Sequence, residues 1–402
     1  MTEQTKVQQV HLLIVTGQAQ ANLIPILQLK PDIIALAISD SMQKKADQFI
    51  KIVKSLTDYK EDSIIFFKHV PDAGIERIID KAMEIEDQLN TQFPNSKISY
   101  HATGGNKLMT LGFYSVFSDK NNQIIYCDTS HGEIEHIYPE KQSAIPIQSV
   151  LNIKGALLSM EQTYRKSADE EWQKNANSRK ELTKWLGHNA QELDQQGFLG
   201  CLNKFVQEAT KQTSRDKENV LTYPEQYFRQ VPRRIWVTAL KKLTEHKIFQ
   251  WDQNKPNCLY FDSIQGAEYI SGQWLEEYTW HIIKDLNPFD VLANVEFAES
   301  GALKSDIRNE MDCIVAHHNQ LLFIECKTIN FQKQIGKDTD ILYKLESLGH
   351  RAAGLYGYKW LVSARKLDDP ALKRAKEYKI EVIYGADLKN LKDKVIEWMA
   401  KV

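Results

Sequence analysis

The strongest constraint on the fold is the alternation of short apolar runs with amphipathic stretches over the first 140 residues. The apolar runs cover residues 11–16, 33–39, 63–70, 97–103 and 123–128. Nearly continuous apolar character is typical of strands that are buried on both faces of a parallel sheet. The stretches between them place apolar residues three to four positions apart, as amphipathic helices do. The pattern predicts a doubly wound α/β domain over residues 1–150, with ligands bound at the carboxyl ends of its strands.

The rest of the chain is predicted to form two further domains, because 402 residues are too many for one ordinary core. From about residue 155 the periodicity becomes helical, and an amphipathic stretch at 232–251 precedes a short strand at 257–262. Residues 151–270 are therefore interpreted as either a helical spacer or a winged-helix-like module. Residues 271–402 alternate helices and strands in the manner of a compact α/β domain.

Composition and charge limit the cellular location and the partners that the sequence suggests. The formal net charge of −2 gives no overall attraction to nucleic acid. The five cysteines fall at no metal-like spacing, which indicates reduced thiols. The polar start is no secretion signal, and no apolar run approaches the roughly 18 residues that cross a bilayer. We expect a cytoplasmic protein.

The segment NEMDCIVAHHNQLLFIECKT, residues 309–328, places ionisable groups on otherwise apolar strands. A turn at HNQ would set Asp312 on one strand of a hairpin beside Glu325 and Lys327 on the other, and the last two share a face. A surface ion pair is the structural alternative, but the apolar flanks indicate an internal strand, where unpaired charge is costly. Carboxylates from two strands can hold Mg²⁺ or Mn²⁺, and a lysine can stabilise the negative charge that develops in phosphodiester hydrolysis.

The helix predicted at 272–286 supplies another acid. On a helical wheel of about 100° per residue, Glu276 lies on the face with Thr279 and Ile283, which must pack on the sheet. Glu277 falls with Lys284 and His281, on the side predicted to face solvent. Glu276 is interpreted as a site carboxylate; the alternative is an acid that merely complements the start of a helix.

At these residues the chain resembles the PD-(D/E)XK nuclease superfamily, the restriction-endonuclease-like fold. The resemblance implies a metal-dependent phosphodiester hydrolase whose catalytic residues are Glu276, Asp312, Glu325 and Lys327, with the three acids as metal ligands. Met311 replaces the proline of the family name. Glu310 is a possible auxiliary ligand, and the helix that carries Lys344 and Glu346 occupies a place that often borders such sites.

Polar loops follow three of the predicted N-terminal strands, at what should be one edge of the sheet. After the fourth strand, HATGGNKLMT (101–110) combines two glycines with a helix start and a lysine, which suits a phosphate group. The spacing is that of neither a Walker A motif nor GxGxxG. The candidate ligand-binding residues are Thr16, Gly17, Gln18, Asn22, Ser39, Thr103, Gly104, Gly105, Asn106 and Lys107.

This half resembles the CARF domain, the CRISPR-associated Rossmann fold, over roughly residues 8–150. Joined to a nuclease-like C-terminus, the chain resembles the CARF nucleases of type III CRISPR defence. The resemblance implies a two-fold homodimer that binds a cyclic oligoadenylate, expected to be cyclic tetra-adenylate, across both sensor domains. Binding would activate metal-dependent cleavage of DNA, RNA or both.

Two other functions remain open from the sequence. The chain could be a ligand-responsive DNA-binding regulator, with residues 223–262 as its winged helix and a degenerate C-terminal scaffold. Alternatively, the sensor half could itself cleave the ring.

Overall fold

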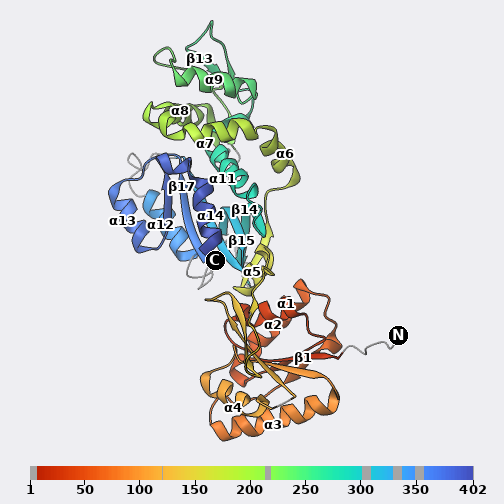
Figure 1. Ribbon diagram of the computed structural model, residues 1–402. Helices are drawn as coiled ribbons and strands as arrows, with labels where there is room; N and C mark the ends of the chain where they lie inside the picture. The colour runs from red at the N-terminus through yellow and green to blue at the C-terminus, as the bar shows by residue number, and fades with distance from the viewer. Residues whose placement is uncertain are drawn as a thin grey trace, which may run out of the picture. The chain divides into compact units, whose positions relative to one another are not determined.

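The computed structural model in Figure 1 describes residues 7–119, 121–212, 219–300, 309–328, 337–348 and 357–401. The chain divides into two compact units, Met1–Gln162 and Thr163–Val402. The domain boundaries expected at residues 150 and 270 stay predictions. Within the described ranges, no helix combines the length and apolar character that crossing a membrane requires.

The first unit is built on a seven-stranded sheet in the order β3-β2-β1-β4-β5-β6-β7. Its strands are β1 (Gln9–Ile14), β2 (Ile33–Ala37), β3 (Ile64–Phe67), β4 (Lys97–His101), β5 (Gln123–Asp128), β6 (Glu133–Tyr138) and β7 (Ile145–Pro146). The first five are parallel and confirm the five predicted strands, whereas β6 and β7 continue the sheet antiparallel.

Helices connect these strands as the periodicity predicts. They are α1 (Ala19–Leu29), α2 (Gln43–Leu56), α3 (Ile75–Gln92), α4 (Lys107–Phe117) and α5 (Ile153–Ser159), with short 3-10 turns η1 (Asp40–Met42) and η2 (Glu61–Ser63). Strand order reverses between β1 and β4, so the loops that follow these two strands border the crevice where such sheets bind ligands.

The second unit contains a six-stranded sheet in the order β18-β17-β16-β15-β14-β8. Its strands are β8 (Gln162–Lys166), β14 (Asp290–Glu299), β15 (Asn309–His317), β16 (Gln320–Lys327), β17 (Gly357–Ser363) and β18 (Glu381–Tyr384). The prediction of purely helical structure after residue 155 is wrong at β8. This strand is short and lies at the sheet edge, so half of it stays solvated and its apolar signal is weak.

The helices of this unit are α6 (Glu170–Ser178), α7 (Lys180–Gln195), α8 (Phe198–Ala209), α9 (Ile235–Glu245), α10 (Ile264–Glu268), α11 (Trp274–Lys284), α12 (Lys337–Leu348), α13 (Asp369–Glu377) and α14 (Leu391–Lys401), with a π-helical turn η3 (Tyr269–Gln273) and a 3-10 turn η6 (Gly385–Leu388). Figure 1 shows α12 and α13 together on the side of β17 away from α11.

The segment from α6 to η3, called the helical part below, also carries two small antiparallel sheets. One pairs β9 (Thr210–Gln212) with β10 (Asn219–Leu221), and the other has the order β11-β13-β12, formed by β11 (Glu225–Tyr227), β12 (Gln250–Trp251) and β13 (Cys258–Tyr260). One hydrophobic core runs through the helices and the six-stranded sheet, from Leu182 on α7 to Trp398 on α14. The helical part and the large sheet are therefore packed as one body.

The close approach of α7 to α11 depends on Gly187. A Cβ atom at this position would lie 2.2 Å from the ring of Tyr278, which is buried and donates its hydroxyl hydrogen to the Leu388 carbonyl at 2.8 Å. Because the ring is anchored, it cannot move aside cheaply.

We expect Gly187→Ala to lower the free energy of unfolding by about 1–3 kcal/mol, the usual cost of overpacking a core. Gly200→Ala on α8 is the matched control, since its Cβ would meet the Arg365 guanidinium at an ordinary 3.4 Å and alanine favours helix. Urea unfolding of both variants measures the difference, and equal stabilities would contradict this account of the α7–α11 contact.

Candidate active site and ligand-binding edge

The hairpin of β15 and β16 brings the predicted charged residues together. Its two turn residues, His318 and Asn319, both have positive φ, and the register pairs Cys313 with Ile324. Ile324 and Cys326 belong to the core on the side of α11. Since side chains alternate along a strand, Glu325 and Lys327 point to the other face, as predicted.

Lys327 is the centre of this group. Its Nζ lies 2.7 Å from Glu325 Oε1 and 3.4 Å from Asp312 Oδ2. Asp312 Oδ2 also accepts a hydrogen bond from the Cys326 backbone N–H at 2.6 Å. Glu325 is 3 % exposed, whereas the side chains of Asp312 and Lys327 are 13 % and 25 % exposed, so the cluster is buried at Glu325 and opens to solvent at Lys327.

Burial and mutual repulsion dominate the electrostatics of the acids. Burial, followed by repulsion from Glu325, raises the pKa of Asp312 to about 6. Burial, followed by repulsion from Asp312, raises the pKa of Glu276 to about 8. Burial acts to lower the pKa of Lys327, but the Asp312 and Glu325 carboxylates outweigh it and raise that pKa.

A second ammonium group reaches the same carboxylate from α12. Lys344 Nζ lies 3.1 Å from Glu325 Oε2 and 3.2 Å from Oε1. This placement agrees with the expectation that α12 borders the site. The charge of Glu346, in contrast, acts on Lys359 and Tyr378.

Glu276 approaches the cluster from α11, and its position is visible in the charges that act on it. Asp312, Lys327 and Glu325 all influence its pKa, and so does Glu310. Among the described residues it makes no hydrogen bond or ion pair. Nor do any three His, Cys, Asp or Glu side chains in the described ranges form a group that could hold a metal ion as they stand.

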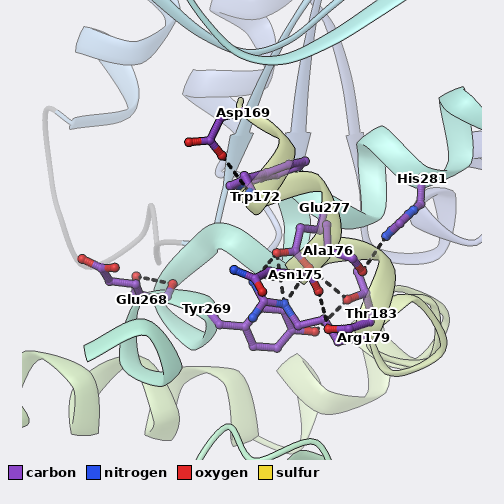
Figure 2. A network of polar contacts seen from close by, with 12 residues as sticks. Asp169, Trp172, Asn175, Ala176, Arg179, Thr183, Glu268, Tyr269, Glu277 and His281 are labelled. Carbon is purple, nitrogen blue, oxygen red and sulfur yellow. Dashed lines mark hydrogen bonds and ion pairs between the residues drawn. The ribbon is translucent and has the colours of Figure 1, made fainter. Parts of the chain in front are cut away.

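The prediction that Glu277 and His281 face solvent is wrong. Both are buried, because α6 and α7 cover the face of α11 that the helical wheel left unpartnered: His281 contacts the Ala176 carbonyl of α6, and Glu277 lies beside Thr183 of α7. Figure 2 shows Glu277 directed at Arg179, whose Nε donates to its two carboxylate oxygens at 3.1 and 3.0 Å. Burial raises the pKa of Glu277, whereas the Arg179 hydrogen bonds and charge oppose that rise.

Arg179 is also fixed from its other side. Its guanidinium lies 4.5 Å from the centre of the Tyr269 ring, and the Tyr269 hydroxyl is 2.8 Å from Thr183 Oγ1 (Figure 2). Sequence reasoning missed Arg179 because 98 residues separate it from Glu277 and nothing in a single sequence couples them. The sequence did contain one signal for a buried partner of Glu277: two adjacent acids, at 276 and 277, point to different sides of one helix.

The turn between α10 and α11 ties this network to the hairpin. Gly272 departs from helical geometry within the π-helical turn, and the Thr328 hydroxyl donates to the Ser271 carbonyl. The Thr328 carbonyl in turn accepts from Asn203 Nδ2 of α8 at 2.9 Å. Thr328 directly follows Lys327, so the π-helical turn and α8 both contact the end of β16 at this point.

The loop after β4 contacts the last residue of β1 at the edge of the first sheet. A Cβ atom on Gly104 would lie 2.0 Å from the Ile14 carbonyl oxygen, which also accepts a hydrogen bond from Asn22 Nδ2 at 3.0 Å. Gly105 has a φ of 79° and packs against the Ile14 side chain. Only glycine permits the loop after β4 to approach the end of β1 this closely.

Several of the predicted ligand-binding residues hold the loops in shape. Thr103 Oγ1 accepts from the Cys127 backbone N–H at 2.8 Å. Asn106 caps α4 by accepting from the Met109 backbone N–H at 3.0 Å, and its amide nitrogen donates to the Asp72 carbonyl. Ser39 is buried and lies 3.1 Å from Ser41, hydroxyl to hydroxyl.

The remaining candidates face outward. Gly17, Gln18 and Lys107 are exposed, and Thr16 is half-buried, whereas Asn22 is buried beneath the loop. The edge therefore consists of a rigid support with a few free polar groups and exposed backbone. This division suits a ligand that is recognised by backbone amides and a cation at a helix start.

Two family models match the chain, one in each unit. Residues 10–155 match the Card1 CARF domain, and residues 265–402 match the Card1-like endonuclease domain. The chain thus joins a CRISPR-associated Rossmann fold domain to an endonuclease domain. It is a CARF-domain nuclease of the Card1 family.

Solved structures share the fold over nearly the whole chain. Protein VC1899 from Vibrio cholerae has 21 % sequence identity and a TM-score of 0.78, with 98 % of each chain covered. Can2 from Sulfobacillus thermosulfidooxidans, solved in complex with cyclic tetra-adenylate, has 21 % identity and a TM-score of 0.73, with 97 % of each chain covered. No curated protein gives a match.

The buried Arg179–Glu277 pair yields a stability prediction. We expect Glu277→Ala to lower the free energy of unfolding by about 3–5 kcal/mol, because it leaves a buried guanidinium without its partner. The double variant Arg179→Met/Glu277→Leu should recover most of this loss, since it removes both charges. Thermal and urea unfolding of the two proteins, with Glu192→Ala at an exposed position of α7 as the control, measures the effect. A double variant as unstable as Glu277→Ala would contradict it.

Proposed function

We propose that the chain is a metal-dependent nuclease that cleaves phosphodiester bonds of nucleic acid when a cyclic oligoadenylate, cyclic tetra-adenylate first among them, binds its CARF domain. The observation that carries the proposal is the largely buried cluster of Asp312, Glu325 and Lys327 on one hairpin of the endonuclease domain. Such a group is costly to bury and requires a function or a partner that compensates for it.

The residues have distinct roles in this hydrolysis. Lys327, held between two carboxylates, is fully protonated at neutral pH and stabilises the negative charge that develops on the phosphate. Lys344 adds positive charge at the far side of Glu325. Asp312 is fixed by the Cys326 backbone N–H, so its second oxygen stays available for a ligand.

The chemistry of the donors suits a divalent cation. Asp312, Glu325 and Glu276 offer hard carboxylate oxygens, and the repulsion that helps to raise the pKa of Asp312 and Glu276 is what a cation would relieve. As the described side chains stand they do not form a metal-binding group, so the cation would have to draw them together. Asp312, Glu325 and Glu276 would hold Mg²⁺ or Mn²⁺ there, and the cation would supply Lewis-acid polarisation of the phosphodiester. Glu276 would complete the ligand set from the helix.

The activator is assigned to the edge formed by the loops after β1 and β4. Exposed Gln18 and Lys107 and the amides at the start of α4 suit a ring of phosphates. Can2 was solved with cyclic tetra-adenylate and shares this fold. The ring can activate only by binding the active arrangement more tightly than the inactive one.

A homodimer is the proposed working form. Leu108, Leu111 and Tyr114 lie three residues apart on α4, next to the glycine loop, and are 46 %, 61 % and 38 % exposed. An apolar stripe beside the ligand edge suits a two-fold contact that presents two copies of the edge to one symmetric ring.

Cleavage is expected to depend on the hairpin charges. With cyclic tetra-adenylate and Mn²⁺ or Mg²⁺ present, Glu325→Gln and Lys327→Met should each reduce cleavage about a hundredfold or more, because each removes a group that acts on the transition state. The assay uses labelled single-stranded DNA, single-stranded RNA and duplex DNA, with cyclic tri-, tetra- and hexa-adenylate in parallel.

Ring binding measured by calorimetry should be unchanged in both hairpin variants, and Glu377→Gln, an exposed acid on α13, is the charge-matched control. Full cleavage by Glu325→Gln and Lys327→Met would refute the proposed site. An equal cleavage rate with and without cyclic oligoadenylate would refute the proposed activation.

The ligand edge generates a separate expectation. Gly104→Ala should weaken ring binding about tenfold or more, since its methyl group would collide with the Ile14 carbonyl and displace the loop. Lys107→Gln should shift activation to higher ring concentrations while the rate at saturation stays the same. Lys51→Gln on α2 is the control, and calorimetry with ring titrations of cleavage distinguishes the cases. Unaltered ring affinity in both variants would contradict the assignment of the ring to this edge.

A further inference from the structure

An exposed basic surface lies in the helical part of the second unit, outside the residues assigned to cleavage. We define it by Lys204 on α8, Arg229, Arg233 and Arg234 in the turn before α9, and Lys241 on α9. All five are exposed. Within the described ranges, Arg229, Arg233, Arg234 and Lys241 form no ion pair, whereas Lys204 is paired with Glu208 at 3.2 Å.

The exposed face of α9 is a regular row. Thr238, Lys241 and Glu245 follow one another at spacings of three and four residues, so they share one side of the helix, and all three are exposed. Arg234, also exposed, is the N-cap residue directly before α9 and has non-helical backbone angles. The opposite side, with Ala239, Leu240 and Leu243, is buried in the core. The row therefore belongs to a firmly packed helix, and Glu245 is the single acid on it.

Charged residues of α8 and of the turn before α9 lie near one another. Burial raises the pKa of the Cys201 thiol to about 11, and the charges of Lys204 and Arg229 oppose that rise, which places both cations beside this part of α8. Asn203, one residue before Lys204, donates to the carbonyl of Thr328 next to Lys327. The basic surface thus begins at the contact between α8 and the strand that carries the cleavage site.

The chemistry of this surface favours phosphates over a protein partner. Protein interfaces are centred on aromatic and aliphatic anchors. The outer row of α9 has none, and Val231 is the single exposed large apolar residue of the turn that carries Arg229, Arg233 and Arg234. Arg234 and Lys241 are seven residues apart, about 10 Å along the helix, a length over which one strand of a duplex carries about three phosphates. Figure 1 places α9 beyond α8, on the side away from the six-stranded sheet.

We propose that this basic surface binds the phosphate backbone of the nucleic-acid substrate and holds it for the endonuclease site. The inference rests on the proposed function, because it assigns the surface to the substrate of that reaction. Backbone binding of this kind does not depend on sequence and weakens as salt increases. It would raise the local concentration of substrate at the cleavage site.

The test measures binding without cleavage. Full-length protein carrying Glu325→Gln, in buffer with EDTA, is titrated into fluorescein-labelled single-stranded DNA, single-stranded RNA and duplex DNA, and anisotropy is followed over a range of salt concentrations. Arg234→Gln/Lys241→Gln should weaken binding about tenfold and reduce the slope of log affinity against log salt by about 1.5, because two phosphate contacts are lost.

The control is Lys44→Gln/Lys51→Gln on α2, which removes the same charge from two exposed lysines also seven residues apart. This pair should bind like the parent. Binding by Arg234→Gln/Lys241→Gln that matches the parent, or an equal loss in both double variants, would overturn the proposal. Circular dichroism confirms that the surface variants are folded.

The same proteins separate this inference from the proposed function. If protein with an intact Glu325 never cleaves, yet Arg234→Gln/Lys241→Gln binds more weakly than its control, the basic surface is supported and the nuclease function fails. If it cleaves and Arg234→Gln/Lys241→Gln has an unchanged KM, the surface is refuted and the nuclease function is supported.

Discussion

The candidate site of the second unit depends on placing opposite charges close together on one largely buried hairpin. Asp312, Glu325 and Lys327 are tolerated there because each finds a partner within the cluster, from a backbone N–H to a second lysine on α12. Removing such groups from water is expensive, and even good pairing only repays the cost. The cluster therefore adds little stability. Its value lies in holding acids and ammonium groups at fixed positions, which is what a charge-stabilising site requires.

At the ligand edge of the first unit, polar side chains fix the backbone rather than one another. The side chains of Asn22, Thr103 and Asn106 form hydrogen bonds with backbone groups of β1, β5 and α4, and Gly104 lets the loop after β4 contact the carbonyl of Ile14. These contacts leave few free side chains, but they fix the backbone amides. A large, charged ligand loses less binding energy when the loops that receive it are already ordered.

The sequence predicted what local periodicity encodes and missed what depends on distant contacts. The parallel strands β1–β5 and the hairpin with Asp312, Glu325 and Lys327 follow from apolar runs and alternation, so they could be located. The edge strand β8 has too weak a pattern. Glu277 was assigned to solvent because a helical wheel identifies one packed face, whereas α11 has two, and the second is created by α7. No single sequence announces that Arg179 will pair with it.

The two faces of α11 constrain how a signal can reach the site. Glu276 faces the hairpin, and Glu277, about 100° around the helix, is clamped by Arg179 of the helical part. Moving the helical part alone would separate a buried ion pair and open the shared core. That costs several kcal/mol, comparable to the whole coupling energy that an effector usually supplies. The Arg179–Glu277 pair and the shared core therefore oppose any sliding of the helical part over the sheet.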